Sequence, residues 1–319
     1  MNTLERWPAR SAQTPPPDSA FVFVHGILSS HDTFTAFCDS IYLDPRFACS
    51  DLYYFDYRYH DAMTQNGQSL ANELQLHFGD GTRQVTLVCH SMGGLIARLA
   101  VMSAQLDFVK SIFLLGTPNL GALSTAQLGI LAQLARKTAG IISGTFIRKS
   151  GITDLTRVYE ILSGYRRSAG RASHIDYVSI PGCYFHEERP AYAYSITDVW
   201  ADTFATMDNV FSIIRALAPL FSVSMSRPHD GIVEERSNCL APTGAGRWSE
   251  KSATITYPNP PRRYYHVQLQ RCEELTHTAV HGDAEVISLV KDICAAPDLQ
   301  TWRASLPNTS LASMVITPP

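Results

Sequence analysis

One segment constrains the fold more than any other: an apolar strand that runs straight into a serine turn and then into a helix. Residues 85–97 read VTLVCHSMGGLIA, and small residues, Cys89 and Gly93, stand two positions either side of Ser91. A sharp turn with a strained central residue needs such small neighbours. It would lift the serine hydroxyl above the carboxyl end of a sheet and place it at a helix N-terminus, where backbone N–H groups favour negative charge. The alternative is an ordinary strand–helix turn whose serine only caps the helix.

The rest of the chain alternates between strand-like and helix-like segments. Apolar, β-branched and aromatic runs predict strands at residues 21–24, 52–57, 84–89, 109–115, 174–180 and 263–269. Helices are predicted at about 69–78, 95–104 and 284–295. This alternation predicts an α/β fold with a mainly parallel sheet and helices on both faces. Two segments, about 121–171 and 191–228, interrupt the rhythm and are expected to form helical cap insertions over the sheet edge.

Length and composition indicate one soluble domain. The chain has 319 residues, of which 45% are hydrophobic and 17% charged, so it can bury a large core without disulfides or metal. We expect a flexible leader over residues 1–20, a single domain with its insertions over 21–296, and a C-terminal tail over 297–319. The net charge of −3, with no dense Lys/Arg stripe, argues against nucleic acid as the main partner.

Cysteine usage and hydropathy suggest a compartment. The seven cysteines are scattered and include no C-x-x-C pair, which argues against a disulfide framework or a cysteine zinc site and favours a reducing environment. The first twenty residues hold no apolar core of a signal peptide, and no uncharged apolar run reaches about 18 residues. We therefore expect a cytoplasmic protein.

With its flanking strand and helix, the serine turn resembles the G-x-S-x-G elbow of lipases and esterases in the α/β-hydrolase superfamily. Cys89 replaces the usual first glycine and is small enough for that position. The resemblance implies an α/β-hydrolase fold with Ser91 as nucleophile and no metal or organic cofactor.

The segment FVFVHGILSS, over residues 21–30, resembles the HG loop of the same lipases. An oxyanion hole would then be formed by two backbone N–H groups, one from Ile27 in this loop and one from Met92 after the nucleophile. His25 would brace the loop rather than act as a base. The alternative is a plain glycine turn after a strand.

In this family the acid and the histidine follow the serine in that order. Asp230, in RPHDGIV, resembles the D-G-x-V acid loop, although an Asp-Gly turn without a catalytic part would look the same. His277 and His281 lie between the last predicted strand and helix, where the family has its histidine. His277 matches the pattern better, and His281 is the alternative base. At i, i+4 spacing the two could also be half a metal site, but no third ligand has suitable spacing.

The resemblance covers residues 21 to about 294. It implies a serine hydrolase that cleaves carboxylic esters, of small molecules or acyl lipids, through an acyl-enzyme intermediate. Thioesterase or amidase chemistry on the same triad, or an inactive binding protein, are the alternatives. Residues 116–121, GTPNLG, resemble a lipase segment expected to border the acyl pocket. The insertion at 121–171 is expected to be either a lid that touches a membrane surface transiently or a helix packed on the core.

Overall fold

The computed structural model describes residues 2–8, 18–27, 29–59, 61–121, 154–155, 157–182, 230, 233, 235–238, 240, 261, 263–269, 275, 277, 279–305 and 313–316. Among these residues, eight strands form one sheet in the order β1-β3-β2-β4-β5-β6-β7-β8. The strands are β1 (Thr3–Arg6), β2 (Ser19–Val24), β3 (Ser50–Asp56), β4 (Gln84–His90), β5 (Val109–Leu115), β6 (Asp176–Ile180), β7 (Arg263–Gln268) and β8 (Ser313–Ile316). All neighbours from β3 to β7 pair in parallel, while β1 and β8 pair antiparallel with β3 and β7. The predicted mainly parallel sheet is confirmed.

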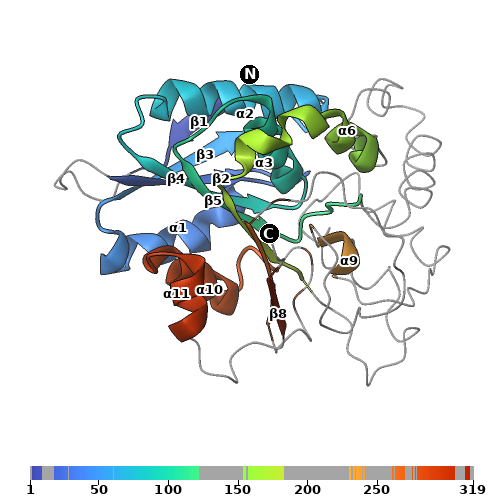
Figure 1. Cartoon of the computed structure of the whole chain (residues 1–319). Coiled ribbons are helices and arrows are strands. Elements are labelled where there is room, and N and C mark those ends of the chain that lie inside the picture. Colours follow the sequence, from blue (N-terminus) through green and yellow to red (C-terminus); the bar gives the residue numbers. More distant parts are fainter. Residues whose placement is uncertain are drawn as a thin grey trace, which may run out of the picture.

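Helices cover both faces of this sheet. The α-helices are α1 (Thr35–Tyr42), α2 (Met63–Phe78), α3 (Met92–Ser103), α6 (Val158–Gly164), α9 (Glu235–Asn238), α10 (Ala284–Ala295) and α11 (Leu299–Ser305), with 3-10 turns η1 (His31–Phe34), η2 (Pro45–Phe47) and η3 (Arg166–Ala172). Helices α2 and α3 lie on one side of the sheet, and α1, α10 and α11 lie on the other (Figure 1). Within the described part of the chain, no helix is long and apolar enough to span a bilayer.

The central strands are apolar on both faces because each face of the sheet packs into its own hydrophobic core cluster. In β2, Val22 and Val24 belong to the core cluster that includes residues of α2 and α3, whereas Phe21 and Phe23 belong to the cluster with residues of α1 and α10. Successive side chains of a strand point to opposite faces, so a strand buried on both sides reads as a continuous apolar run. Each fully buried side chain of this size contributes roughly 1.5–3 kcal/mol.

Both chain ends correct the expected domain layout. The supposed flexible leader contains β1, which pairs with β3 and buries Leu4 opposite Phe55. The supposed tail contains β8 and α11, which buries Leu299 and Trp302. The two strands are only four residues long, too short to show a strand pattern in the sequence, so their order comes from pairing with an edge strand.

Little of the two predicted insertions falls within the described residues. Helix α6 and turn η3 lie in the later part of the first insertion. Residues 122–153 of the first insertion and all of the second, 191–228, lie outside the described residues, so the lid and the second cap stay predictions.

Candidate active site

Ser91 occupies a strained turn between β4 and α3. Its backbone has φ 52° and ψ −127°, and among the described residues it is the only non-glycine with positive φ. Holding such a conformation costs about 1–3 kcal/mol, and surrounding structure must supply it. The Ser91 N–H donates to the carbonyl of Leu115, at the end of β5, over 2.9 Å. The turn is therefore anchored to the neighbouring strand at the carboxyl edge of the sheet.

The neighbours of Ser91 are small because the end of β2 lies against them. A Cβ atom on Gly93 would lie 2.4 Å from the carbonyl oxygens of both Val24 and His25, so only glycine fits. Cys89 is fully buried opposite Val24, and burial raises the pKa of its thiol well above the ordinary value. It is a packing residue at the position where the lipase pattern has glycine.

The structure brings Ser91, His277 and Asp230 together in one hydrogen-bonded chain. The Nε2 atom of His277 lies 2.8 Å from Ser91 Oγ, and its Nδ1 atom lies 2.7 Å from Asp230 Oδ2. An ionised carboxylate can only accept, so Nδ1 carries the proton and the Nε2 lone pair faces the serine hydroxyl. This is the arrangement in which an imidazole can take a proton from serine.

Asp230 is both a turn residue and the partner of the histidine. It is fully buried, and its Oδ1 atom accepts from the Val233 N–H at 2.7 Å while Oδ2 receives the imidazole. Its carbonyl also accepts from the His277 N–H at 2.8 Å. Gly116, with φ +58°, leaves room for this contact, because a Cβ there would lie 3.2 Å from His277 Nδ1. These contacts hold Asp230 with one carboxylate oxygen directed at the imidazole.

His281, the alternative base, lies beyond His90 rather than beside Ser91. Its ring centroid is 4.6 Å from that of His90 and 6.0 Å from that of Phe34. Burial, with a smaller contribution from nearby His277, lowers the pKa of His281 to about 4. Both ring nitrogens of His277 are engaged by Asp230 and Ser91, so the two histidines do not form a metal-binding pair. No three His, Cys, Asp or Glu side chains among the described residues are placed to hold a metal ion.

The HG loop lies directly against the nucleophile. A Cβ atom on Gly26 would lie 3.0 Å from Ser91 Cβ. His25 braces the loop, since its Nδ1 atom donates to the Gly26 carbonyl at 2.7 Å and its ring stacks on Tyr57 with centroids 4.3 Å apart. Burial lowers the pKa of His25, which keeps this ring neutral. That the N–H groups of Ile27 and Met92 stabilise an oxyanion stays a prediction.

A buried polar network behind the site was missed in the sequence. Arg98 of α3 donates from Nη1 to Asn119 Oδ1 at 2.9 Å, and Asn119 Nδ2 donates to the Asn238 carbonyl at 2.9 Å. The Asn119 N–H also donates to the Ser237 carbonyl at 2.7 Å. The GTPNLG segment therefore ties α3 to α9, which begins five positions after Asp230. An arginine within the apolar helix LIARLAV was the sequence signal that could have revealed it.

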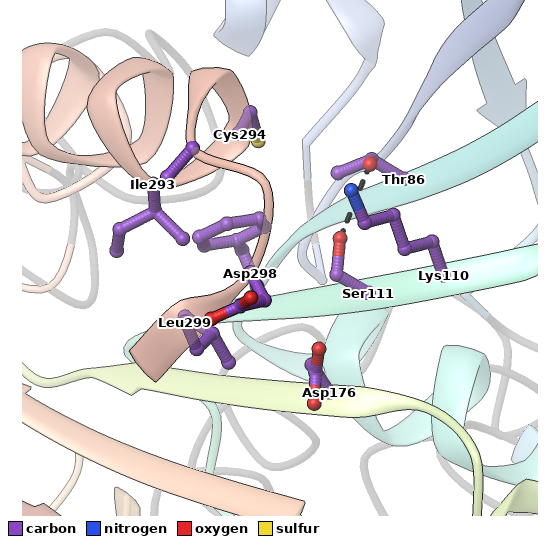
Figure 2. Close-up of a pocket in the computed structure, with 10 residues that line it drawn as sticks. Thr86, Lys110, Ser111, Asp176, Ile293, Cys294, Asp298 and Leu299 are labelled. Carbon is purple, nitrogen blue, oxygen red and sulfur yellow. Dashed lines mark hydrogen bonds between the residues drawn. The ribbon is translucent and has the colours of Figure 1, made fainter. Parts of the chain in front are cut away.

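A pocket at the other end of the sheet is separate from this site. It lies where β4, β5 and β6 begin, beside the junction of α10 and α11 (Figure 2). Thr86 and Ser111 share a 3.1 Å hydrogen bond there, and Lys110 and Asp176 line the same space. Ser91 follows the opposite, carboxyl end of β4, so this pocket is not where Ser91 would meet a substrate.

Comparison with known proteins identifies the family. A family model described as "Alpha/beta hydrolase family" matches residues 21–287. The chain belongs to this family. Comparison with curated protein sequences gives no significant match.

Solved structures show the same fold at low sequence identity. The mature form of Bacillus licheniformis lipase BlEst2 superposes with a TM-score of 0.52 at 17% identity, covering 91% of this chain and 97% of that one. Its propeptide form gives 0.56 at 16% identity, covering 92% and 53%. Phospholipase PlaB from Legionella pneumophila gives 0.51 at 13% identity, covering 90% and 62%. This chain thus spans between half and two thirds of the latter two chains, and all three similarities support the fold.

Proposed function

We propose that the protein is a serine hydrolase that cleaves carboxylic esters through an acyl-enzyme intermediate, with Ser91, His277 and Asp230 as its catalytic triad. One observation carries the proposal: a serine in a strained turn is hydrogen-bonded to an imidazole whose other nitrogen meets a buried carboxylate. Serine is a weak nucleophile near neutral pH until a base so oriented removes its proton.

Acylation uses every member of this chain. As Ser91 Oγ attacks the ester carbonyl carbon, its proton moves to His277 Nε2, and the Asp230 carboxylate stabilises the imidazolium without taking the proton. The N–H groups of Met92 and Ile27 would donate to the oxyanion, and each such donor contributes about 3–4 kcal/mol. When the tetrahedral intermediate collapses, His277 gives its proton to the leaving oxygen, and the alcohol departs.

Deacylation repeats these steps with water as the nucleophile. His277 takes a proton from the water as its oxygen attacks the acyl carbon. It then returns that proton to Ser91 Oγ as the carboxylic acid is released. The enzyme ends the cycle in its starting protonation state, and no metal or organic cofactor enters any step.

A fluorophosphonate probe tests the proposal. The native protein should be labelled on Ser91, and both heat-denatured protein and the Ser91→Ala variant should stay unlabelled. Ser91→Ala or His277→Ala should lower ester hydrolysis by about 10⁴-fold or more, with the fold retained. Complete failure of the folded protein to label would favour a binding protein. Undiminished turnover in His277→Ala would remove His277 from the triad.

The acyl preference is tested with p-nitrophenyl esters of increasing chain length. A steep preference for long chains would support acyl lipids as substrates and a lid formed by the insertion at 121–171. Activity confined to acetate and butyrate esters would count against both.

A further inference from the structure

We propose that His90 is a positioning residue of this active site: its imidazole holds the backbone carbonyl of His277 and so sets where the catalytic base stands relative to Ser91. The inference deepens the proposed function and rests on it. It gives a role to a side chain that takes no part in the proton transfers described above.

The geometry follows from where His90 stands. It is the last residue of β4, opposite Leu115 of β5, and directly precedes Ser91. Its Nε2 atom lies 2.7 Å from the carbonyl oxygen of His277. A carbonyl can only accept, so Nε2 carries a proton and donates it. This hydrogen bond links β4, the strand that leads into Ser91, to the backbone of His277.

This bond completes the attachment of His277. Its Nδ1 and backbone N–H both meet Asp230, at 2.7 and 2.8 Å, and its Nε2 meets Ser91 Oγ. Its carbonyl is the fourth hydrogen-bonding group, and His90 binds it. Among the described hydrogen bonds, this one ties the His277 backbone to β4, whereas the other backbone bond ties it to the acid. The separation of Oγ and Nε2 is therefore set from two sides.

The His90 ring is held in this orientation by its neighbours. Its centroid lies 4.9 Å from that of His277 and 4.6 Å from that of His281, and a Cβ on Gly26 would lie 2.9 Å from its Nδ1. Nδ1 is buried and has no hydrogen-bond partner among the described residues. A buried ring nitrogen without a hydrogen-bond partner lowers stability, so an apolar side chain would fill the same space at a lower free-energy cost. Its bond from Nε2 to His277 is what distinguishes it from an apolar residue of the same size.

The electrostatics suit the role. Burial, with His281 and His277 adding to it, lowers the pKa of His90 well below its ordinary value. The ring therefore stays neutral while His277 becomes an imidazolium in each half-reaction. A second positive charge beside that imidazolium would oppose proton uptake by the base.

Two variants of similar volume separate positioning from packing. Glutamine can present an N–H near the place of the imidazole Nε2, whereas leucine cannot donate. His90→Leu should lower kcat about 10- to 100-fold with KM nearly unchanged, the size of effect expected when a catalytic group shifts by about 1 Å. His90→Gln should recover kcat to within about fivefold of the original enzyme, a rescue that a packing role would not produce. His77→Leu, on the partly exposed end of α2, is the matched control and should leave kcat unchanged.

Three results would count against the inference. A folded His90→Leu protein with undiminished kcat, or a folded His90→Gln protein as slow as His90→Leu, would overturn the inference while leaving the proposed function intact. Should His90→Leu not fold, imidazole nitrogen NMR of the unmodified enzyme still tests it: His90 should be neutral with its proton on Nε2, and a proton on Nδ1 would refute it. If the unmodified enzyme neither hydrolyses esters nor labels on Ser91, the proposed function fails, and this inference with it.

Discussion

Replacing Asp230 by asparagine should disable the base without disturbing the fold. Asparagine has the same shape as aspartate, but only its side-chain oxygen can accept a hydrogen bond, while its NH₂ group donates. The Val233 N–H lies 2.7 Å from Oδ1 and can only donate, so the asparagine oxygen must stay there. The new amide NH₂ group then faces His277 Nδ1 across 2.7 Å. Nδ1 becomes the acceptor, and the imidazole proton moves to Nε2.

That change of tautomer sets the size of the effect. An imidazole that carries its proton on Nε2 has no lone pair to accept the proton of Ser91 Oγ. We expect kcat/KM for a p-nitrophenyl ester to fall about 10⁴-fold, or about 5.4 kcal/mol of transition-state stabilisation. The melting temperature should stay within a few degrees, because the N–H groups of Val233 and His277 keep the oxygens that accept from them.

The matched control is Asp283→Asn. Asp283 caps α10 by accepting from the N–H groups of Glu285 and Val286, a task asparagine performs equally well. This variant should therefore keep full activity. If Asp230→Asn keeps more than a tenth of the original kcat/KM while His277→Ala is inactive, the reasoning about tautomers is refuted.

Three further predictions concern stability. Gly93→Ala should lower the free energy of unfolding by several kcal/mol and abolish hydrolysis, because its Cβ would lie 2.4 Å from two backbone oxygens. Gly164→Ala is the control: nothing lies within 4 Å of its Cβ, so it should melt at or slightly above the original temperature. Equal melting temperatures for the two variants would contradict this reasoning. Asn119→Ala removes an acceptor from the buried guanidinium of Arg98 and should lower the free energy of unfolding by about 2–3 kcal/mol. A loss of less than about 0.5 kcal/mol, measured by urea denaturation, would contradict this prediction. The folded pKa of His281 is about 4 against an ordinary 6.5, so the unfolded chain alone takes up its proton between these values. Stability should fall as pH drops through that window, by up to about 1.4 kcal/mol per pH unit, and His281→Phe should flatten the dependence; an unchanged slope in that variant would exclude His281 as its source.

The sequence predicts the centre of this fold better than its edges. Strands at 84–89 and 109–115 were evident because the later parts of β4 and β5, residues 87–89 and 112–115, are buried on both faces and read as uninterrupted apolar runs. Helix α10 was predicted over residues 284–295, and its observed bounds are Ala284–Ala295, because Asp283 caps it and its core residues recur at helical spacing. Strands β1 and β8 could not be foreseen, since their four-residue stretches are ordered by pairing rather than by composition.

Helix α2 begins six residues before the predicted start for a tertiary reason. Its first turns, MTQNGQ, carry few apolar residues and show no clear periodicity. Gly67 allows close approach to α3, where an added Cβ would lie 2.6 Å from that of Leu99, and Asn66 is buried with its amide donating to the Arg58 carbonyl. These contacts, which are not encoded locally, make the segment helical.

The candidate site was predicted as separate residues, and the structure supplies their connections. Ser91, Asp230 and His277 were each predicted from a separate motif, in the chain order serine, acid, histidine. In the structure they are joined by hydrogen bonds. The role inferred for His90 could not be predicted, because its partner is a backbone carbonyl 187 positions away. Motif reasoning identifies side chains with chemistry, whereas residues that bind backbone groups become visible only in three dimensions.

The most direct test is to trap the covalent intermediate. The folded protein is mixed with a p-nitrophenyl ester, quenched in acid within the first turnovers, digested and analysed by mass spectrometry. We expect an added acyl mass on the peptide containing Ser91, together with a burst of nitrophenol close to one equivalent per active site. Ester hydrolysis with no acyl adduct on Ser91 and no burst, or an adduct on any other side chain, would contradict the proposed chemistry.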